Sequence, residues 1–173
     1  MVDTIKGDDI CYDSEKFLIK ITDNNPGLVV EGNHIKFNRV VFDVDFLDIL
    51  PNSGPHSDKQ KYVGILCKNC KNLTFEKCVL IIRYEASPGK VPPSDYPVFI
   101  DNKYLNSHNE EIKESFMGVV VKDSENITID CLLDVRQTLS DGTIVRRVMN
   151  NNGDYQLYVN DIPISNPTYL NYC

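Results

Sequence analysis

The chain has 173 residues, of which 42% are hydrophobic, and its 25 acidic and 18 basic residues leave a formal net charge of −7. This size and composition fit one globular domain spanning residues 1–173 with a sizeable core. The acidic excess is spread along the chain, which argues against nucleic acid and anionic membranes as partners. The N-terminus carries acids where a signal peptide would be apolar, and no window is long enough for membrane insertion, so we expect a cytoplasmic or virion location.

The first predicted element is a strand at Lys16–Thr22, which we interpret as an N-terminal cap. After it, one pattern occurs three times: PGLVVEGNHIKFNRVVFDVDF from Pro26, GILCKNCKNLTFEKCVLII from Gly64 and GVVVKDSENITIDCLLDV from Gly118. Each copy has a glycine, an apolar run, a polar break, an alternating strand and a further apolar run. The pattern predicts a repeated unit of three strands joined by a turn and a bend.

The middle strand of each copy alternates apolar and polar residues with a period of two, which places one face inside. A single unit cannot bury that face, whereas stacked copies bury a continuous column. We therefore expect an all-β domain of stacked repeats; the alternative is an antiparallel sandwich in which similar strands recur by chance. The expected inward columns are Ile35, Leu73 and Ile127, and Phe37, Phe75 and Ile129.

Long insertions are expected between the copies, because the glycines at their starts are 37 and 54 residues apart, more than one repeat needs. These insertions are polar and rich in breakers at 51–61 and 85–97, and a short strand is expected at Val98–Ile100. Beyond the last copy, the predicted strands Thr143–Val148 and Tyr155–Val159 flank Asn152 and Gly153, which is a hairpin signal. The tail at 163–173 is apolar and aromatic.

The phrases GILCKNCKNLTFEKC and GVVVKDSENITIDC resemble the rungs of the right-handed parallel β-helix proteins, the pectate-lyase-like superfamily. The resemblance implies a short right-handed parallel β-helix, or β-solenoid, with long inserted loops. Its rungs would lie near 26–46, 62–83 and 116–136, followed by a C-terminal hairpin and tail at 141–173. In this family an asparagine before the second strand often forms a ladder with its neighbours, and the matching positions here are His34, Asn72 and Asn126.

Enzymes with this fold that cleave acidic polysaccharides place acidic residues, with calcium or a basic residue, on the exterior of one sheet. Alternation along the third strands puts Asp45, Arg83 and Arg136 in one outward column, and Asp43 and Asp134 in the next. Carboxylates two strand spacings apart, about 10 Å, lie at the wide limit for an acid and base pair. No catalytic residue is therefore predicted. The candidate ligand-binding residues are Asp43, Asp45, Arg83, Asp134 and Arg136.

Six cysteines could form three disulfides, but a chain of this length can build a core without them, and we expect free thiols. Cys67 and Cys70 have the spacing of half a zinc site, yet no second pair follows, so no metal and no cofactor are predicted. The glycosylation sequons at Asn72 and Asn126 occupy equivalent repeat positions, so the repeat itself explains them.

Two classes of function fit these features. The first is a non-enzymatic structural module of a virus particle or similar large complex. It would use its loops and its C-terminal segment for contacts with other protein subunits or with copies of itself. The alternative is a carbohydrate-binding or polysaccharide-cleaving protein that acts through the exterior groove, although about three rungs would hold little of a polymer. Aromatic residues are favoured as interface anchors. The candidate interface residues are Tyr155, Tyr158, Tyr169, Leu170 and Tyr172.

Overall fold

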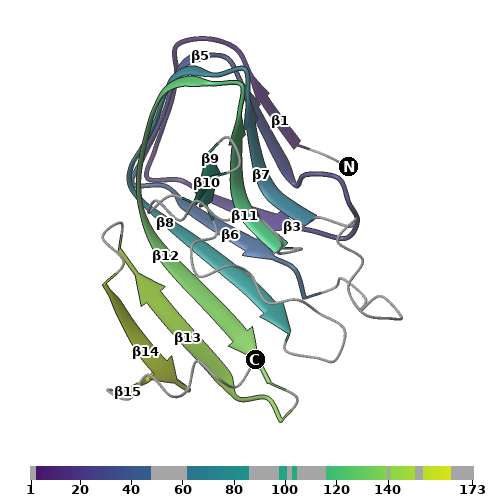
Figure 1. Ribbon diagram of the computed structural model, residues 1–173, viewed down its shortest axis with the longest axis vertical. Helices are drawn as coiled ribbons and strands as arrows, with labels where there is room; N and C mark the ends of the chain where they lie inside the picture. Colours follow the sequence, from purple (N-terminus) through teal and green to yellow (C-terminus); the bar gives the residue numbers. More distant parts are fainter. Residues whose placement is uncertain are drawn as a thin grey trace.

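The computed structural model describes residues 3–47, 62–85, 98–100, 103–104, 116–139, 141–150 and 154–164. Every helix or strand assigned within these residues is a β-strand, which confirms the all-β class. The strands form two sheets. In Figure 1 the sheets face each other in the upper part of the molecule, and the second sheet continues below through β13, β14 and β15.

The six-stranded sheet contains, in spatial order, β1 (Asp3–Lys6), β4 (Leu28–Glu31), β7 (Tyr62–Lys68), β11 (Phe116–Lys122), β9 (Val98–Ile100) and β10 (Lys103–Tyr104). The nine-stranded sheet runs β15 (Ile162–Ile164), β14 (Tyr155–Val159), β13 (Ile144–Met149), β12 (Glu125–Thr138), β8 (Lys71–Glu85), β5 (Asn33–Asn38) and β2 (Ile10–Asp13). In addition, β3 (Lys16–Lys20) pairs with β6 (Val41–Asp45), and β6 pairs with β8.

The three sequence repeats pair in parallel in the register that their alignment predicts. Phe75 is the Cα partner of Phe37 on one side and of Ile129 on the other. The glycines at the head of the repeats also stack, since a Cβ built on Gly64 would lie 2.7 Å from the carbonyl oxygen of Gly118. The repeat is therefore a packing device, as the sequence indicates.

The β-solenoid predicted for the domain is nevertheless wrong. Both sheets are mixed: β10 pairs antiparallel with β9, and β12, β13, β14 and β15 pair antiparallel in succession. The antiparallel sandwich is not found either, because the repeats themselves pair in parallel. The described part of the chain is an arrangement of two mixed sheets, in which parallel repeats are extended by antiparallel strands.

A tight turn after β12 explains this departure. Gly142 has a φ of +88°, which favours glycine, and its N–H donates to the carbonyl of Leu139 at 3.0 Å. Asp141 accepts a hydrogen bond from the N–H of Thr143 at 2.9 Å. This turn sends β13 back along β12. The hairpin predicted from Asn152 and Gly153 is confirmed as the antiparallel pair of β13 and β14, although its tip lies outside the described residues.

A further turn of strands precedes the three repeats. The strand predicted at Lys16–Thr22 is observed as β3, but it does not act alone, because β1, β2 and β3 pair in parallel with β4, β5 and β6. We call these strands and their connections, residues 3–21, the terminal turn. Its sequence aligns without a gap on the next turn at an offset of 25 residues.

The core between the sheets is apolar and contains an aromatic cluster. Phe75 is 1% exposed, and its ring stacks on Phe37 with centroids 5.0 Å apart. Tyr12 stacks on the other face of Phe37 at 5.5 Å, and Phe17 stacks on Phe42 at 5.5 Å. The cluster therefore continues into the terminal turn, where Tyr12 and Phe17 are only half-buried.

A polar ladder follows one corner of the stacked turns. Asn126 donates to the side-chain oxygen of Asn72, Asn72 lies 3.2 Å from His34 Nε2, and His34 Nδ1 lies 3.3 Å from Asp9. These four residues have positive φ values, from +56° to +58°. The predicted ladder positions are thus in contact. The amide nitrogen of Asn72 contacts both Asn33 and His34, so glycan attachment there would remove a hydrogen that the ladder uses.

Candidate interaction surfaces

The five predicted ligand-binding residues lie together on the outer face of the nine-stranded sheet. Asp45, Arg83 and Arg136 share one row across β6, β8 and β12, and Asp43 and Asp134 share the adjacent row on either side of Ile81. The structure therefore places them in the predicted columns. Both rows continue onto β13, where Arg146 lies opposite Arg136.

Arginines hold the two most buried carboxylates of this face. Arg83 donates to Asp43 through Nε at 2.8 Å and Nη2 at 3.1 Å. Arg146 donates to Asp134 through Nε at 3.2 Å and Nη2 at 2.8 Å, and Arg136 adds a bond of 3.0 Å. Such bidentate ion pairs are strong and directional. Asp43 and Asp134 are only 7% and 4% exposed, because the guanidinium groups cover them.

The pKa of Asp134 reflects this environment. Burial alone would raise the pKa of its carboxyl group, but hydrogen bonds from Arg146 and Arg136 outweigh burial and hold the pKa below its usual value of 3.8. The carboxyl group is thus ionised at neutral pH, and both of its oxygens accept hydrogen bonds from arginine. A general acid needs a raised pKa and a free proton, so this site does not suit acid catalysis.

We expect Asp134→Asn to lower the free energy of unfolding by about 2 to 4 kcal/mol, because it leaves two largely buried arginines without their carboxylate. The Nε of Arg136 already lacks a hydrogen-bond partner. Asp161→Asn is the matched control, since Asp161 also bonds Arg146, at 3.1 Å, but is 83% exposed; its effect should stay below about 1 kcal/mol. Denaturant titration of both variants measures the difference.

The same substitution has an expected pH dependence. A carboxyl group whose pKa is lowered by folding stabilises the protein above its unfolded pKa and loses that effect as the pH falls through the folded value. The stability gap between the parent chain and Asp134→Asn should be constant above about pH 5 and shrink below about pH 4. A gap that does not change down to pH 2 would contradict the ion pairing.

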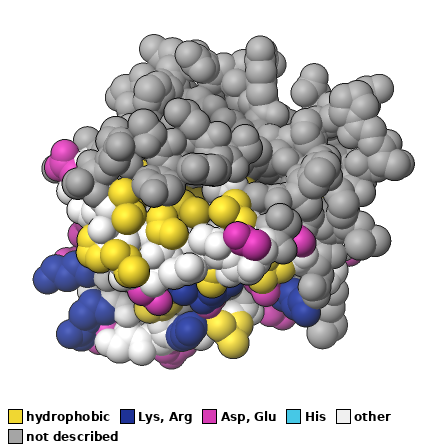
Figure 2. Space-filling view, turned by 90° about the horizontal axis from the view of Figure 1, so that it is seen from below, with side chains coloured by type: hydrophobic (Ala, Val, Ile, Leu, Met, Phe, Trp, Pro, Cys, Tyr) yellow, Lys and Arg dark blue, Asp and Glu magenta, His cyan; other side chains and the backbone are white. Residues whose placement is uncertain are grey.

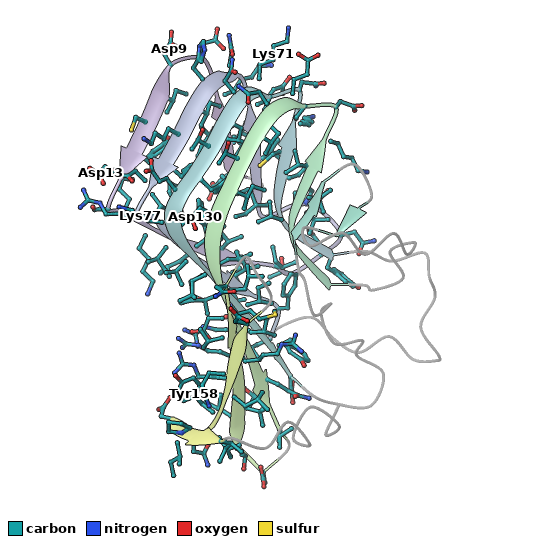
Figure 3. The ribbon with its side chains drawn as sticks, turned by 60° about the vertical axis from the view of Figure 1, so that its left-hand side comes forward. Asp9, Asp13, Lys71, Lys77, Asp130 and Tyr158 are labelled. Atoms are coloured by element: carbon teal, nitrogen blue, oxygen red, sulfur yellow. The ribbon has the colours of Figure 1, made fainter. Side chains whose placement is uncertain are left out.

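Arg146 and Asp161 were not predicted as part of this cluster. Arg146 links Asp134 to Asp161, and its guanidinium carbon lies 5.3 Å from the centre of the Tyr158 ring. Tyr158 is half-buried and lies far from the terminal turn in Figure 3. Among the other predicted interface residues, Tyr155 is described only by its backbone in β14, and Tyr169, Leu170 and Tyr172 lie outside the described residues.

Basic and acidic side chains also lie side by side on the face of the molecule seen from below. They are interleaved there with hydrophobic side chains (Figure 2). Four large hydrophobic residues of the described part are exposed, with accessible fractions of 74% for Leu18, 64% for Ile162, 41% for Leu132 and 39% for Ile144. Leu18, the most exposed of them, belongs to the terminal turn.

The terminal turn forms an open end. On one side, β1 pairs with β4, β2 with β5 and β3 with β6; on the other side, none of the three has a strand partner within the described residues. At the opposite end, β9 continues the six-stranded sheet in parallel, and β13 continues the nine-stranded sheet antiparallel. Unpaired strand edges attract further strands unless something covers them. The open end is therefore a second candidate surface, which the sequence did not reveal.

The cysteines form no metal site with other side chains in the described residues, where no group of three or more histidine, cysteine or acidic residues could hold a metal ion. Cys67, Cys70, Cys78 and Cys131 are buried free thiols, and Cys11 is an exposed one. Cys78 and Cys131 are Cα partners. The hydrogen bond that Cys131 donates to Cys78, together with burial, raises the pKa of Cys131 well above its usual value.

We predict that iodoacetamide labels Cys11 in the native protein but leaves these four buried thiols unmodified until the chain is unfolded, because the reagent cannot reach a thiol that the fold covers. Mass spectrometry of native and denatured samples distinguishes the two states. A Cys78–Cys131 disulfide in the native sample would refute the prediction of reduced thiols.

No family model, curated protein or solved structure matches this chain. The described part contains no helix with the length and apolar character that a membrane crossing requires.

Proposed function

We propose that this chain is a non-enzymatic assembly module that binds another protein through its open end. The observation that carries the proposal is the set of three neighbouring strand edges, in β1, β2 and β3, that have no strand partner within the described residues. Main-chain groups on such edges supply affinity when an extended segment adds to a sheet. Partly exposed Tyr12 and Phe17 beside them would be buried by a partner.

The ion pairs of the outer face support a role without catalysis. Asp43 and Asp134, which would be the acid and base of a polysaccharide-cleaving site, are both bonded to arginines. A carboxylate held in this way is more often structural than catalytic. The virus particle was expected from the resemblance to β-solenoids, which the mixed sheets do not bear out. The proposed role is therefore assembly with another protein in general.

The mass of the native particle tests this proposal. We expect the chain from its native source to sediment as part of a complex larger than the purified chain, and mild crosslinking to join the partner to the terminal turn. Sedimentation as a free monomer in the native extract would contradict the proposal. Release of sugars from uronate polymers by the purified chain would favour the polysaccharide-cleaving alternative.

A further inference from the structure

The free edge of β2 can be identified from its hydrogen bonds. Ser14 donates its backbone N–H to the carbonyl of Asn38 at 2.9 Å. In a parallel ladder alternate residues point the same way, so Tyr12 and Ile10 also face β5. Cys11 and Asp13 consequently present their N–H and C=O groups on the opposite edge. No described strand pairs with that edge.

The apolar core ends at the side chains beside this edge. Ile10 and Tyr12 pair in register with Ile35 and Phe37, and both are half-buried and packed against the core. The Tyr12 ring lies parallel to Phe37, with an angle of 9° between the planes. One face of each side chain is thus covered by the next turn, and an added strand with two apolar residues would cover the other face.

The charged residues in and beside β2 are all acidic. Residues 7–15 contain four acids, Asp8, Asp9, Asp13 and Glu15, and no lysine or arginine, and all four acids are exposed. Figure 3 shows Asp9 and Asp13 at the two ends of this edge strand. Arg39 of the next turn bonds Asp13 at 3.1 Å, His34 contacts Asp9, and Asp8 accepts the backbone N–H of Asn33 at 2.9 Å. Neither Asp8 nor Glu15 has an ion pair within the described residues.

The terminal turn contains five acids and three lysines, so it stays acidic as a whole. Two of these lysines pair with acids of the next turn, Lys6 with Glu31 and Lys16 with Asp43, each at 3.9 Å. A second copy of the chain would bring an equally acidic edge to β2, and like charges on neighbouring strands are destabilising. The charge therefore disfavours self-stacking and favours a cationic partner.

From these observations we infer that the open end binds an extended segment of another protein that adds as a strand along β2, with two apolar residues over Ile10 and Tyr12 and a lysine or arginine at each end. This inference rests on the proposed function and names the chemistry of its partner. The central residue of the added strand lies opposite Cys11, whose exposed thiol can report on the pairing.

The experiment uses the palindromic peptide Lys-Thr-Val-Cys-Val-Thr-Lys, which presents the same pattern in parallel and antiparallel orientation. Its cysteine is activated with thionitrobenzoate, and exchange with Cys11 is followed on full-length Cys173→Ser protein. The matched probe carries glutamate in place of both lysines. We expect the lysine peptide to react about tenfold faster at low salt and the difference to shrink at about 1 M salt.

Two controls separate strand addition from simple charge attraction. Asp13→Pro removes the outward N–H as well as the carboxylate, whereas Asp13→Ala removes the carboxylate alone, so the proline variant should react more slowly. If Asp13→Pro does not fold, peptides methylated on the backbone nitrogens of either set of alternate residues replace it, because one set faces β2. Equal rates for the two Asp13 variants and for both methylated peptides would overturn the inference, as would equal rates for the lysine and glutamate peptides at low salt.

Failure of this inference is distinguishable from failure of the proposed function. If the native chain sediments in a complex but the peptides show no preference, the chain is an assembly module with a different partner chemistry. If the native chain is a free monomer, the proposed function itself fails.

Discussion

Replacing Phe75 by alanine is expected to lower the free energy of unfolding by about 3 to 5 kcal/mol, the usual cost of deleting a buried aromatic side chain. Phe75 is 1% exposed and contacts Phe37 and Phe42 at centroid distances of 5.0 and 5.6 Å. Its neighbours belong to two turns, so they cannot close the cavity without moving paired strands. Denaturant titration of the full chain measures the loss.

Phe17→Ala is the matched control for this prediction. Phe17 belongs to the same aromatic cluster, stacking on Phe42 at 5.5 Å, but it lies in the terminal turn and is half-buried. The same chemical change should therefore cost less, about 1 to 2 kcal/mol. A loss below about 1 kcal/mol for Phe75→Ala would mean that Phe75 is not in a packed core.

The sequence predicted the stacking of the three repeats because the repeats share a pattern that only packing explains. The alternation around Phe37 and Phe75 fixes which residues face inward, and a shift by one residue would turn them outward. The outer rows of Asp45, Arg83 and Arg136 were predicted for the same reason. These features depend on local periodicity, which a sequence displays directly.

The terminal turn was missed although its sequence aligns with the next one. Gly7 matches Gly32, and GDDICY matches GNHIKF, without a gap. An end turn contacts core on one side only, so polar residues are tolerated where inner turns carry apolar ones: Asp3 stands opposite Leu28, and Lys16 opposite Val41. The hydrophobic pattern is weakest where the turn is most exposed.

The antiparallel extension and Arg146 could not be predicted from the repeats. Arg146 reaches Asp134 only because β13 returns along β12, in a register that pairs Arg136 with Arg146. The signal for this return is Asp141 and Gly142, a common hairpin dipeptide. Asp-Gly shows that a reversal occurs, but the register follows from the hydrogen bond between Leu139 and Thr143 that closes the turn, which the dipeptide does not specify.

Gly32→Ala is the second substitution with a large expected effect. A Cβ on Gly32 would lie 1.7 Å from the carbonyl oxygen of Gly7, and the φ of +148° is one that only glycine adopts readily. Because the obstacle is backbone, no side-chain rotation relieves it, and the terminal turn must separate from the next turn. We expect a loss of about 3 to 5 kcal/mol in unfolding free energy.

Gly7→Ala separates the two causes of that loss. Gly7 has the same φ of +148°, but a Cβ there would meet only the Ile10 side chain, at 3.2 Å. This variant should lose only the unfolding free energy that the strained backbone costs, about 1 to 3 kcal/mol. The loss should be smaller than that of Gly32→Ala in the same titration. The difference arises because Gly32 has a turn stacked on it, whereas Gly7 belongs to the open end. If both variants lose the same amount, backbone strain alone accounts for Gly32, and the close stacking of the two turns is refuted.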